Sequence, residues 1–119
     1  MSKNAGFTLI ELVAVMLILA ILAVVAVPEF VDLSEDAEEA AVAGVAGGLS
    51  SASTLNYATE AANGGGTAVA NCTDASALLA TPLPAGYVIT PAAVVAGVSA
   101  TCTLTGPGGE VATFVAIGV

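Results

Sequence analysis

The chain has 119 residues, of which 57% are apolar and 9% are charged, and it carries 1 basic residue against 10 acidic ones. This length is enough for one domain. The sequence has no histidine, which excludes histidine acid–base chemistry and histidine metal ligation. One basic side chain, Lys3, cannot neutralise a row of phosphates, so we expect no direct nucleic-acid binding. The apolar content is also too high for an intrinsically disordered chain.

The most apolar segment lies near the N-terminus. Residues 12–27 form an unbroken apolar run, and the segment extends to residues 7–27 with two polar interruptions, Thr8 and Glu11. As a helix, this segment is about 31 Å long at about 1.5 Å per residue, which matches the thickness of a bilayer core. A cleaved secretory signal peptide is the alternative. The run instead continues through a proline into an acidic stretch, without the small-residue cleavage site of such a signal.

Glu11 is the unusual residue of this segment. A carboxylate inside a membrane costs about 2.5–3.5 kcal/mol or more unless it is paired. Two cations are available as partners: Lys3, and the α-amino group that a cut after Gly6 would create on Phe7. A helical Glu11 could reach its own amine or that of a neighbour. Pairing with a neighbour would set the axial offset between subunits.

These features together resemble the class III signal of the type IV pilin family. They read MSKNAG followed by FTLIELVAVMLILAILAVVAVP, with a lysine in a short leader, Gly6 before the cut, Phe7 after it, Glu11, and Pro28 at the end of the apolar run. The next stretch, PEFVDLSEDAEEAAVAGVAGGLSSASTLNYA, resembles more narrowly the MSHA (mannose-sensitive haemagglutinin) pilins. The second half resembles pilin heads in its general layout.

The resemblance implies that a prepilin peptidase cuts between Gly6 and Phe7 and N-methylates Phe7. Removal of the leader also removes the one basic side chain, which leaves the amine of Phe7 as the cation for Glu11. Many family members carry glycine where Ala20 stands, and in their filaments the helix between that glycine and the proline is often unwound. Alanine is the best helix former, so Ala20 does not mark the upper limit of such a stretch in this chain. Pro28 predicts a kink near residues 24–28, because proline lacks an N–H and clashes with the preceding turn.

Beyond Pro28 the sequence predicts that the helix continues to about residue 62 and then ends at the glycine run 64–66. Its first part is acidic, with carboxylates at Glu29, Asp32, Glu35, Asp36, Glu38 and Glu39. A solvated acidic face and a Ca²⁺ site are the two interpretations. The absence of EF-hand spacing favours the solvated face.

An amphipathic stripe follows the acidic residues. Val42, Val45, Leu49 and Ala52 recur at helical spacing, which predicts a face packed on a core. Three glycines in the same stretch, at positions 44, 47 and 48, either permit close packing of a sheet or another helix or are merely tolerated in an alanine-rich helix.

The remaining residues predict a small antiparallel sheet. Residues 87–90 and, more weakly, 94–98 are strand candidates, and residues 101–105 and 110–117 form a hairpin across the turn at 106–109. On the last strand the even positions 112, 114 and 116 share one face and the odd positions 111–117 share the other. We expect this sheet to pack on the amphipathic stripe.

Two cysteines, Cys72 and Cys102, lie in this second half. An exported chain meets an oxidising compartment, so a disulfide between them is expected, with a reactive thiol as the alternative. Two cysteines alone cannot complete a zinc site, and we predict no metal or cofactor. Asn71-Cys72-Thr73 fits the N-glycosylation pattern formally and is interpreted as a coincidence.

The expected fold is therefore α+β and pilin-like, with a long N-terminal helix whose C-terminal half carries a small antiparallel β-sheet head. The expected divisions are a leader (1–6), a transmembrane and assembly helix (7–28), its amphipathic continuation (29–62) and the disulfide-stapled head (63–119). As the resemblance implies, Glu11 and Pro28 are the assembly residues.

The expected function is that of a structural subunit. The resemblance implies a precursor held in the inner membrane by one span, processing by prepilin peptidase, and assembly by the type IV pilus machinery. Identical subunits then form an extracellular filament for adhesion, surface attachment or motility. A minor pilin or a type II secretion pseudopilin is the alternative. The 4% aromatic content disfavours an electron-conducting fibre, and the lack of a nucleophile–base set or cofactor motif disfavours an enzyme.

Overall fold

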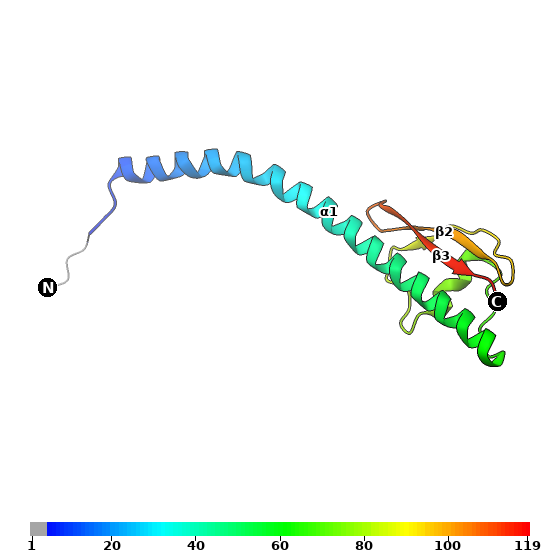
Figure 1. Cartoon of the computed structure of the whole chain (residues 1–119). Coiled ribbons are helices and arrows are strands. Elements are labelled where there is room, and N and C mark those ends of the chain that lie inside the picture. Colours follow the sequence, from blue (N-terminus) through cyan, green and yellow to red (C-terminus); the bar gives the residue numbers. More distant parts are fainter. Residues whose placement is uncertain (1–4) are drawn as a thin grey trace. The chain divides into compact units, whose positions relative to one another are not determined.

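The computed structural model describes residues 5–119, without the side chains of residues 30–32. In chain order the elements are α1 (Leu9–Asn63), the 3₁₀ helix η1 (Cys72–Leu78), β1 (Val88–Ile89), β2 (Ser99–Thr105) and β3 (Val111–Ile117) (Figure 1). Contacts divide the chain into an N-terminal unit, Met1–Glu35, and a head unit, Asp36–Val119. The predicted α+β fold, a long N-terminal helix followed by a small antiparallel sheet packed against it, is confirmed.

Helix α1 lies close to the predicted range of 7–62. It contains Pro28 and ends where the glycine run begins. Gly64 has a φ of 69°, and its N–H donates to the Glu60 carbonyl at 2.8 Å, which is a helix cap that glycine favours. The kink expected near residues 24–28 stays a prediction.

One face of α1 packs into the core of the head unit. The buried helix positions are Val42, Ala46, Leu49 and Ser53. The three apolar ones belong to one core cluster with buried side chains of β2 and β3 such as Leu104 and Phe114. The predicted stripe is confirmed at Val42 and Leu49, which are buried, and at Val45, which is partly buried and packs against the core. Ala52 is partly buried. A hydrophobicity pattern could not place a serine at the centre of the buried face.

The sheet has three antiparallel strands in the order β1-β2-β3. The predicted hairpin is confirmed, with Thr105 opposite Val111 and Ser99 opposite Ile117. The predicted alternation also holds, because Phe114 and Ala116 are buried and Val111, Thr113 and Val115 are exposed.

The weak strand expected at residues 94–98 is wrong. This segment makes only an isolated bridge, from Ala96 to Gly118. Gly97 has a φ of 73°, and the Val98 N–H donates to the Val95 carbonyl at 3.0 Å. The chain therefore turns inside the segment. The other strand candidate, residues 87–90, is shortened to Val88–Ile89 in β1.

The outer edge of β3 is covered by hydroxyl groups of α1. The Ser53 Oγ accepts a hydrogen bond from the Ile117 N–H at 2.7 Å, and the Ser50 Oγ accepts one from the Val115 N–H at 3.0 Å. An unpaired strand edge is a template for pairing with other chains. These two serines therefore tie the helix to the sheet and occupy part of that edge.

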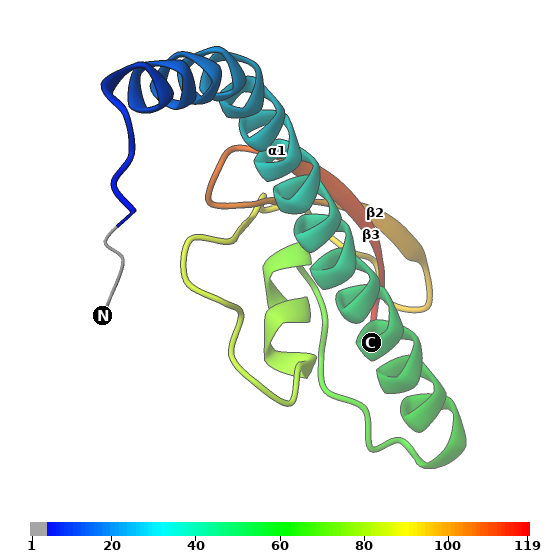
Figure 2. The ribbon, with the colours of Figure 1, turned by 90° about the vertical axis from the view of Figure 1, so that its left-hand side faces the viewer.

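A disulfide joins Cys72 at the start of η1 to Cys102 in β2, with 5.7 Å between their Cα atoms. Both cysteines are buried. Figure 2 shows η1 and the β2–β3 hairpin beside the same part of α1. By the chain-entropy estimate, a cross-link across a separation of 30 residues contributes about 3–4 kcal/mol to stability.

Helix η1 was not predicted. Its cap is Asn71, whose Oδ1 accepts from the Thr73 N–H at 3.2 Å, while the Asp74 carboxylate accepts from the Asn71 N–H at 2.8 Å. The signal was the Asn-x-x-Asp spacing of a reciprocal cap. The Asn71 amide of the formal glycosylation pattern thus serves as a structural cap.

Candidate processing and assembly segment

The segment after the expected cleavage site begins with a reciprocal cap on α1. The Glu11 carboxylate accepts from the Thr8 N–H at 2.9 Å and from the Thr8 hydroxyl at 3.0 Å. The Thr8 hydroxyl in turn accepts from the Glu11 N–H at 3.4 Å. This Thr-x-x-Glu box satisfies donors that a helix start otherwise leaves open. The sequence analysis noted Thr8 but did not predict its cap with Glu11, although the spacing of the two residues was visible.

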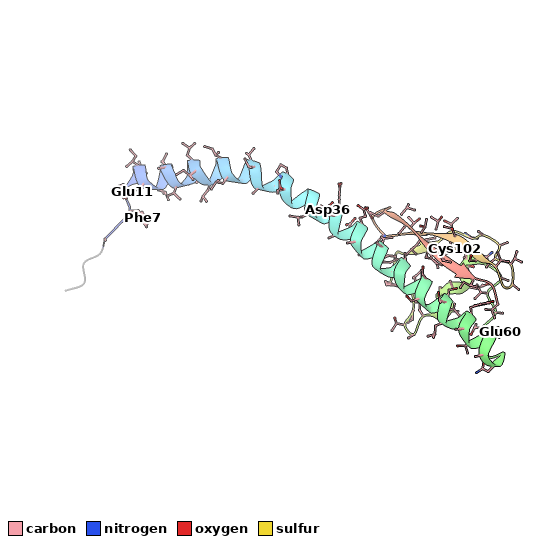
Figure 3. The ribbon with its side chains drawn as sticks, viewed as in Figure 1. Phe7, Glu11, Asp36, Glu60 and Cys102 are labelled. Carbon is pink, nitrogen blue, oxygen red and sulfur yellow. A yellow bond between two sulfur atoms is a disulfide. The ribbon has the colours of Figure 1, made fainter. Side chains whose placement is uncertain are left out.

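Cleavage would place a cation beside this cap. Gly6 and Phe7 are both exposed, and Phe7 lies next to Glu11 at the start of α1 (Figure 3). Lys3, the other cation considered for Glu11, lies outside the described residues. Pairing of Glu11 with the amine of Phe7 concerns the cleaved chain and stays a prediction.

The apolar part of α1 has no cover within its own unit. Its large apolar side chains from Leu9 to Val27 remain exposed, the least exposed being Val15 at 48% and the most exposed Leu9 at 81%. By its length and composition, this part of α1 could cross a membrane. A surface of this size and character is stable in water only when something covers it. The segment therefore requires lipid or protein around it.

The acidic stretch reaches into the head unit, where Asp36 and Glu39 are exposed (Figure 3). Among the described residues, no three or more Asp, Glu, Cys or His side chains come together in a way that could hold a metal ion.

One pair of carboxylates in the head unit does converge. Glu38 of α1 and Glu110 of the β2–β3 turn meet at Gly108, where an added Cβ would collide with oxygens of both side chains. The Oε2 atom of Glu110 is buried without a hydrogen-bond partner. Glycine at position 108 therefore makes room for two carboxyl groups. Sequence reasoning missed this pair, because positions 38 and 110 come together only in the folded chain.

Comparison with known families gives one match. Residues 1–27 match the family described as the prokaryotic N-terminal methylation motif. No curated protein and no solved structure matches the chain. The matched segment contains Gly6, Phe7 and the Thr8–Glu11 cap.

The motif indicates a type IV pilin-like or pseudopilin-type protein. It implies processing by a prepilin peptidase and handling by the associated assembly machinery. The motif and the exposed apolar helix fit a precursor anchored in the membrane. The narrower resemblance to MSHA pilins has no support from these comparisons.

Proposed function

We propose that the chain is a structural subunit of an extracellular type IV pilus. The observation that carries the proposal is the combination of an N-terminal methylation motif, an uncovered apolar helix and a disulfide-linked head on one chain. The helix first anchors the precursor in the inner membrane. It then leaves lipid for a bundle of identical helices, which replaces one apolar environment by another and avoids exposure to water. The heads form the outer shell of the filament.

Within this function, Gly6 and Phe7 form the processing site and Phe7 receives the N-methyl group. Glu11 caps its own helix through Thr8 in the precursor. After cleavage, its carboxylate meets the amine of Phe7 on a neighbouring subunit and sets the axial offset. Pro28 ends the apolar run within α1. We retain the expected division into leader 1–6, assembly helix 7–28, continuation 29–62 and head 63–119.

A minor pilin or a type II secretion pseudopilin is the second candidate, because the methylation motif alone fits these proteins equally well. The disulfide Cys72–Cys102 favours the surface pilus modestly, since a shell exposed to the medium gains from a cross-linked head. Abundance at the cell surface separates the two functions.

The test is the intact mass of protein sheared from the surface of cells that express the full chain. We expect the mass of residues 7–119 with one added methyl group and two hydrogens fewer. This single value reports cleavage, N-methylation, the disulfide and surface assembly together. A Gly6→Leu precursor serves as the control and should keep its leader and remain in the membrane fraction.

Two results would overturn the proposal in different ways. Processed chain that stays wholly in the membrane fraction would transfer the assignment to a pseudopilin or minor pilin. Wild-type chain that retains residues 1–6 in otherwise competent cells would contradict the processing site itself.

A further inference from the structure

The pair Asn63-Gly64 lies where α1 ends, and both residues are exposed. The Asn63 Oδ1 accepts a hydrogen bond from the Gly65 N–H at 2.9 Å. In this Asx turn the side-chain amide of Asn63 folds forward over the next peptide, because Oδ1 reaches the N–H two residues on. The Cγ atom of the amide therefore lies beside the peptide nitrogen of Gly64.

Gly64 leaves that nitrogen sterically open. A Cβ added at Gly64 would meet nothing within 4 Å, so no neighbouring group crowds the peptide. Its φ of 69° belongs to a backbone conformation that glycine adopts at little cost. A peptide nitrogen without a side chain beside it is the least hindered one for an attack on the preceding side-chain amide.

The other two asparagines of the described residues 5–119 are held differently. Asn56 donates from Nδ2 to the Thr67 carbonyl at 2.8 Å, and its Oδ1 accepts from the Thr67 N–H at 2.7 Å. The Asn71 Oδ1 accepts from the Ala92 N–H at 3.3 Å, and the following residue is the buried, disulfide-bonded Cys72. Neither of these two amides combines an exposed site with a glycine after it.

We propose that Asn63 is a modification site, at which the chain deamidates itself without an enzyme. The Gly64 nitrogen loses its proton and forms a bond to Cγ of Asn63. The bond from Cγ to Nδ2 breaks, and the side-chain nitrogen leaves as ammonia with that proton, which gives a five-membered succinimide ring. Water then opens the ring. Hydrolysis at Cγ gives aspartate, and hydrolysis at the main-chain carbonyl carbon gives isoaspartate. Water is the co-reactant, and no atom is oxidised or reduced.

A hydrogen bond of the helix slows this reaction. The Gly64 N–H donates to the Glu60 carbonyl at 2.8 Å, and this bond has to open before the nitrogen can lose its proton and approach Cγ. Helix ends fray, and such local opening costs little free energy compared with global unfolding. The rate of deamidation therefore follows the opening of the last turn of α1.

The modification changes both the charge and the geometry of this turn. A new carboxylate at position 63 lies three residues after Glu60, in a last helical turn that contains no basic residue. Like charges at this spacing and a negative charge at a helix C-terminus are both unfavourable. Isoaspartate also adds one carbon to the main chain, next to the stretch where the Glu60 carboxylate accepts from the Gly66 N–H at 2.9 Å (Figure 3).

Converted chains accumulate with the age of the protein, because the reaction needs no enzyme. Each one carries one negative charge more than the formal −9 of the sequence and a weakened connection between α1 and the rest of the head unit. The inference goes beyond the proposed function, since it holds equally for a pilus subunit and for a pseudopilin.

The first test compares the asparagines within one protein. The full chain in mild detergent is kept in mildly alkaline buffer and is then cut with a glutamate-specific protease. This cut places Asn56 in residues 40–60, whereas Asn63 and Asn71 lie together in residues 61–110. Deamidation adds about 1 Da, and fragmentation in the mass spectrometer locates it. We expect Asn63 to be converted at least tenfold faster than either of the other two.

The matched control is Asn63→Gln, which keeps a side-chain amide at the same position. Its longer side chain has to close a less favourable six-membered ring, so we expect the mass gain at position 63 to disappear.

The second test concerns the helical hydrogen bond. Ala62→Gly weakens the last turn of α1, whereas Ala41→Gly makes the same substitution at an exposed position far from that turn. We expect Ala62→Gly to speed the conversion of Asn63 about threefold and Ala41→Gly to change it by less than about 1.5-fold. Urea opens the helix in every chain, so it should speed the wild-type reaction at least fivefold and bring both variants to a similar rate.

Three results would overturn the inference. The first is a folded chain that keeps Asn63 intact while the chain in urea is fully converted, because the folded site would then not react. The second is conversion of Asn56 or Asn71 at a similar rate, which would remove any special part of the glycine turn. The third is an equal rate in Ala62→Gly and Ala41→Gly, which would contradict control by the helix end. None of these results concerns cleavage or filament assembly, so this inference and the proposed function fail independently.

Discussion

Both ends of α1 carry large apolar side chains, but these side chains have opposite surroundings. Leu17 and Leu49 are leucines of one continuous helix, yet Leu17 is 63% exposed and Leu49 is fully buried. Around Leu49 the chain supplies its own cover in the form of β2, β3 and η1. Around Leu17 the described residues of its own unit supply none. The difference shows that apolar residue types indicate which surfaces need to be covered. The fold decides which of these surfaces are covered by the chain itself.

The largest expected effect concerns Glu11, the charged residue of the uncovered end. Glu11→Ala should leave cleavage and methylation intact and lower the filament yield at least tenfold, because the incoming subunit loses the carboxylate that pairs with an amine. Immunoblotting of processed subunit and quantitation of sheared filaments measure both effects. Thr8→Val is the matched control, since it removes the hydroxyl from the helix cap and keeps the carboxylate. An equal loss of filaments in both variants would assign Glu11 a capping role only.

The same substitution at both ends of α1 tests the comparison directly. Leu49→Ala should lower the free energy of unfolding of the head by about 2–5 kcal/mol, because it leaves a cavity in the core. Leu17→Ala should change it by less than about 0.5 kcal/mol. Urea unfolding of the full chain in mild detergent, followed by near-ultraviolet circular dichroism of the half-buried Tyr87, measures both values. Equal destabilisation by the two variants would contradict the conclusion that only Leu49 is covered by the folded head.

A smaller effect is expected where α1 covers the edge of the sheet. Ser53→Ala should cost about 1–3 kcal/mol, because the Ile117 N–H loses its partner in a buried place. Ser50→Ala should cost about 1 kcal/mol or less, since water can replace its hydroxyl at the more exposed Val115 N–H. The same urea experiment compares them. If Ser50→Ala lowered the free energy of unfolding more than Ser53→Ala, Ser50 and not Ser53 would make the stronger link between α1 and β3.

The smallest expected effect is a gain in stability. Glu110→Gln should raise the free energy of unfolding by about 0.5–1.5 kcal/mol, because an uncharged amide replaces a carboxyl group whose Oε2 atom is buried without a hydrogen-bond partner beside Gly108. Glu39→Gln, at an exposed position on α1, should change it by no more than about 0.5 kcal/mol. Destabilisation by Glu110→Gln would show that the carboxylate, rather than the amide, suits this turn.

Most of the architecture could be predicted from local signals. The apolar run, the glycines after Asn63 and the alternation in residues 111–117 each reflect short-range chemistry: hydrophobic length, helix capping and strand pleat. The expected strand at 94–98 was wrong, because the three valines there favour a strand while Gly97 turns the chain. The Thr8–Glu11 cap was visible as spacing and was overlooked in favour of longer-range partners for Glu11.

By itself, the sequence determined that this protein has an N-terminal methylation motif, an apolar helical segment that is not stable when exposed to water, and a small head with two cysteines. These properties depend on residue type and on neighbours within a few positions. Only the tertiary structure decided that Ser53 lies at the centre of the buried helix face, that Glu38 meets Glu110, and that Gly44 and Gly48 face outward. The reason is physical: which side of a helix is covered depends on the segment that folds back onto it, and that segment lies dozens of residues away along the chain.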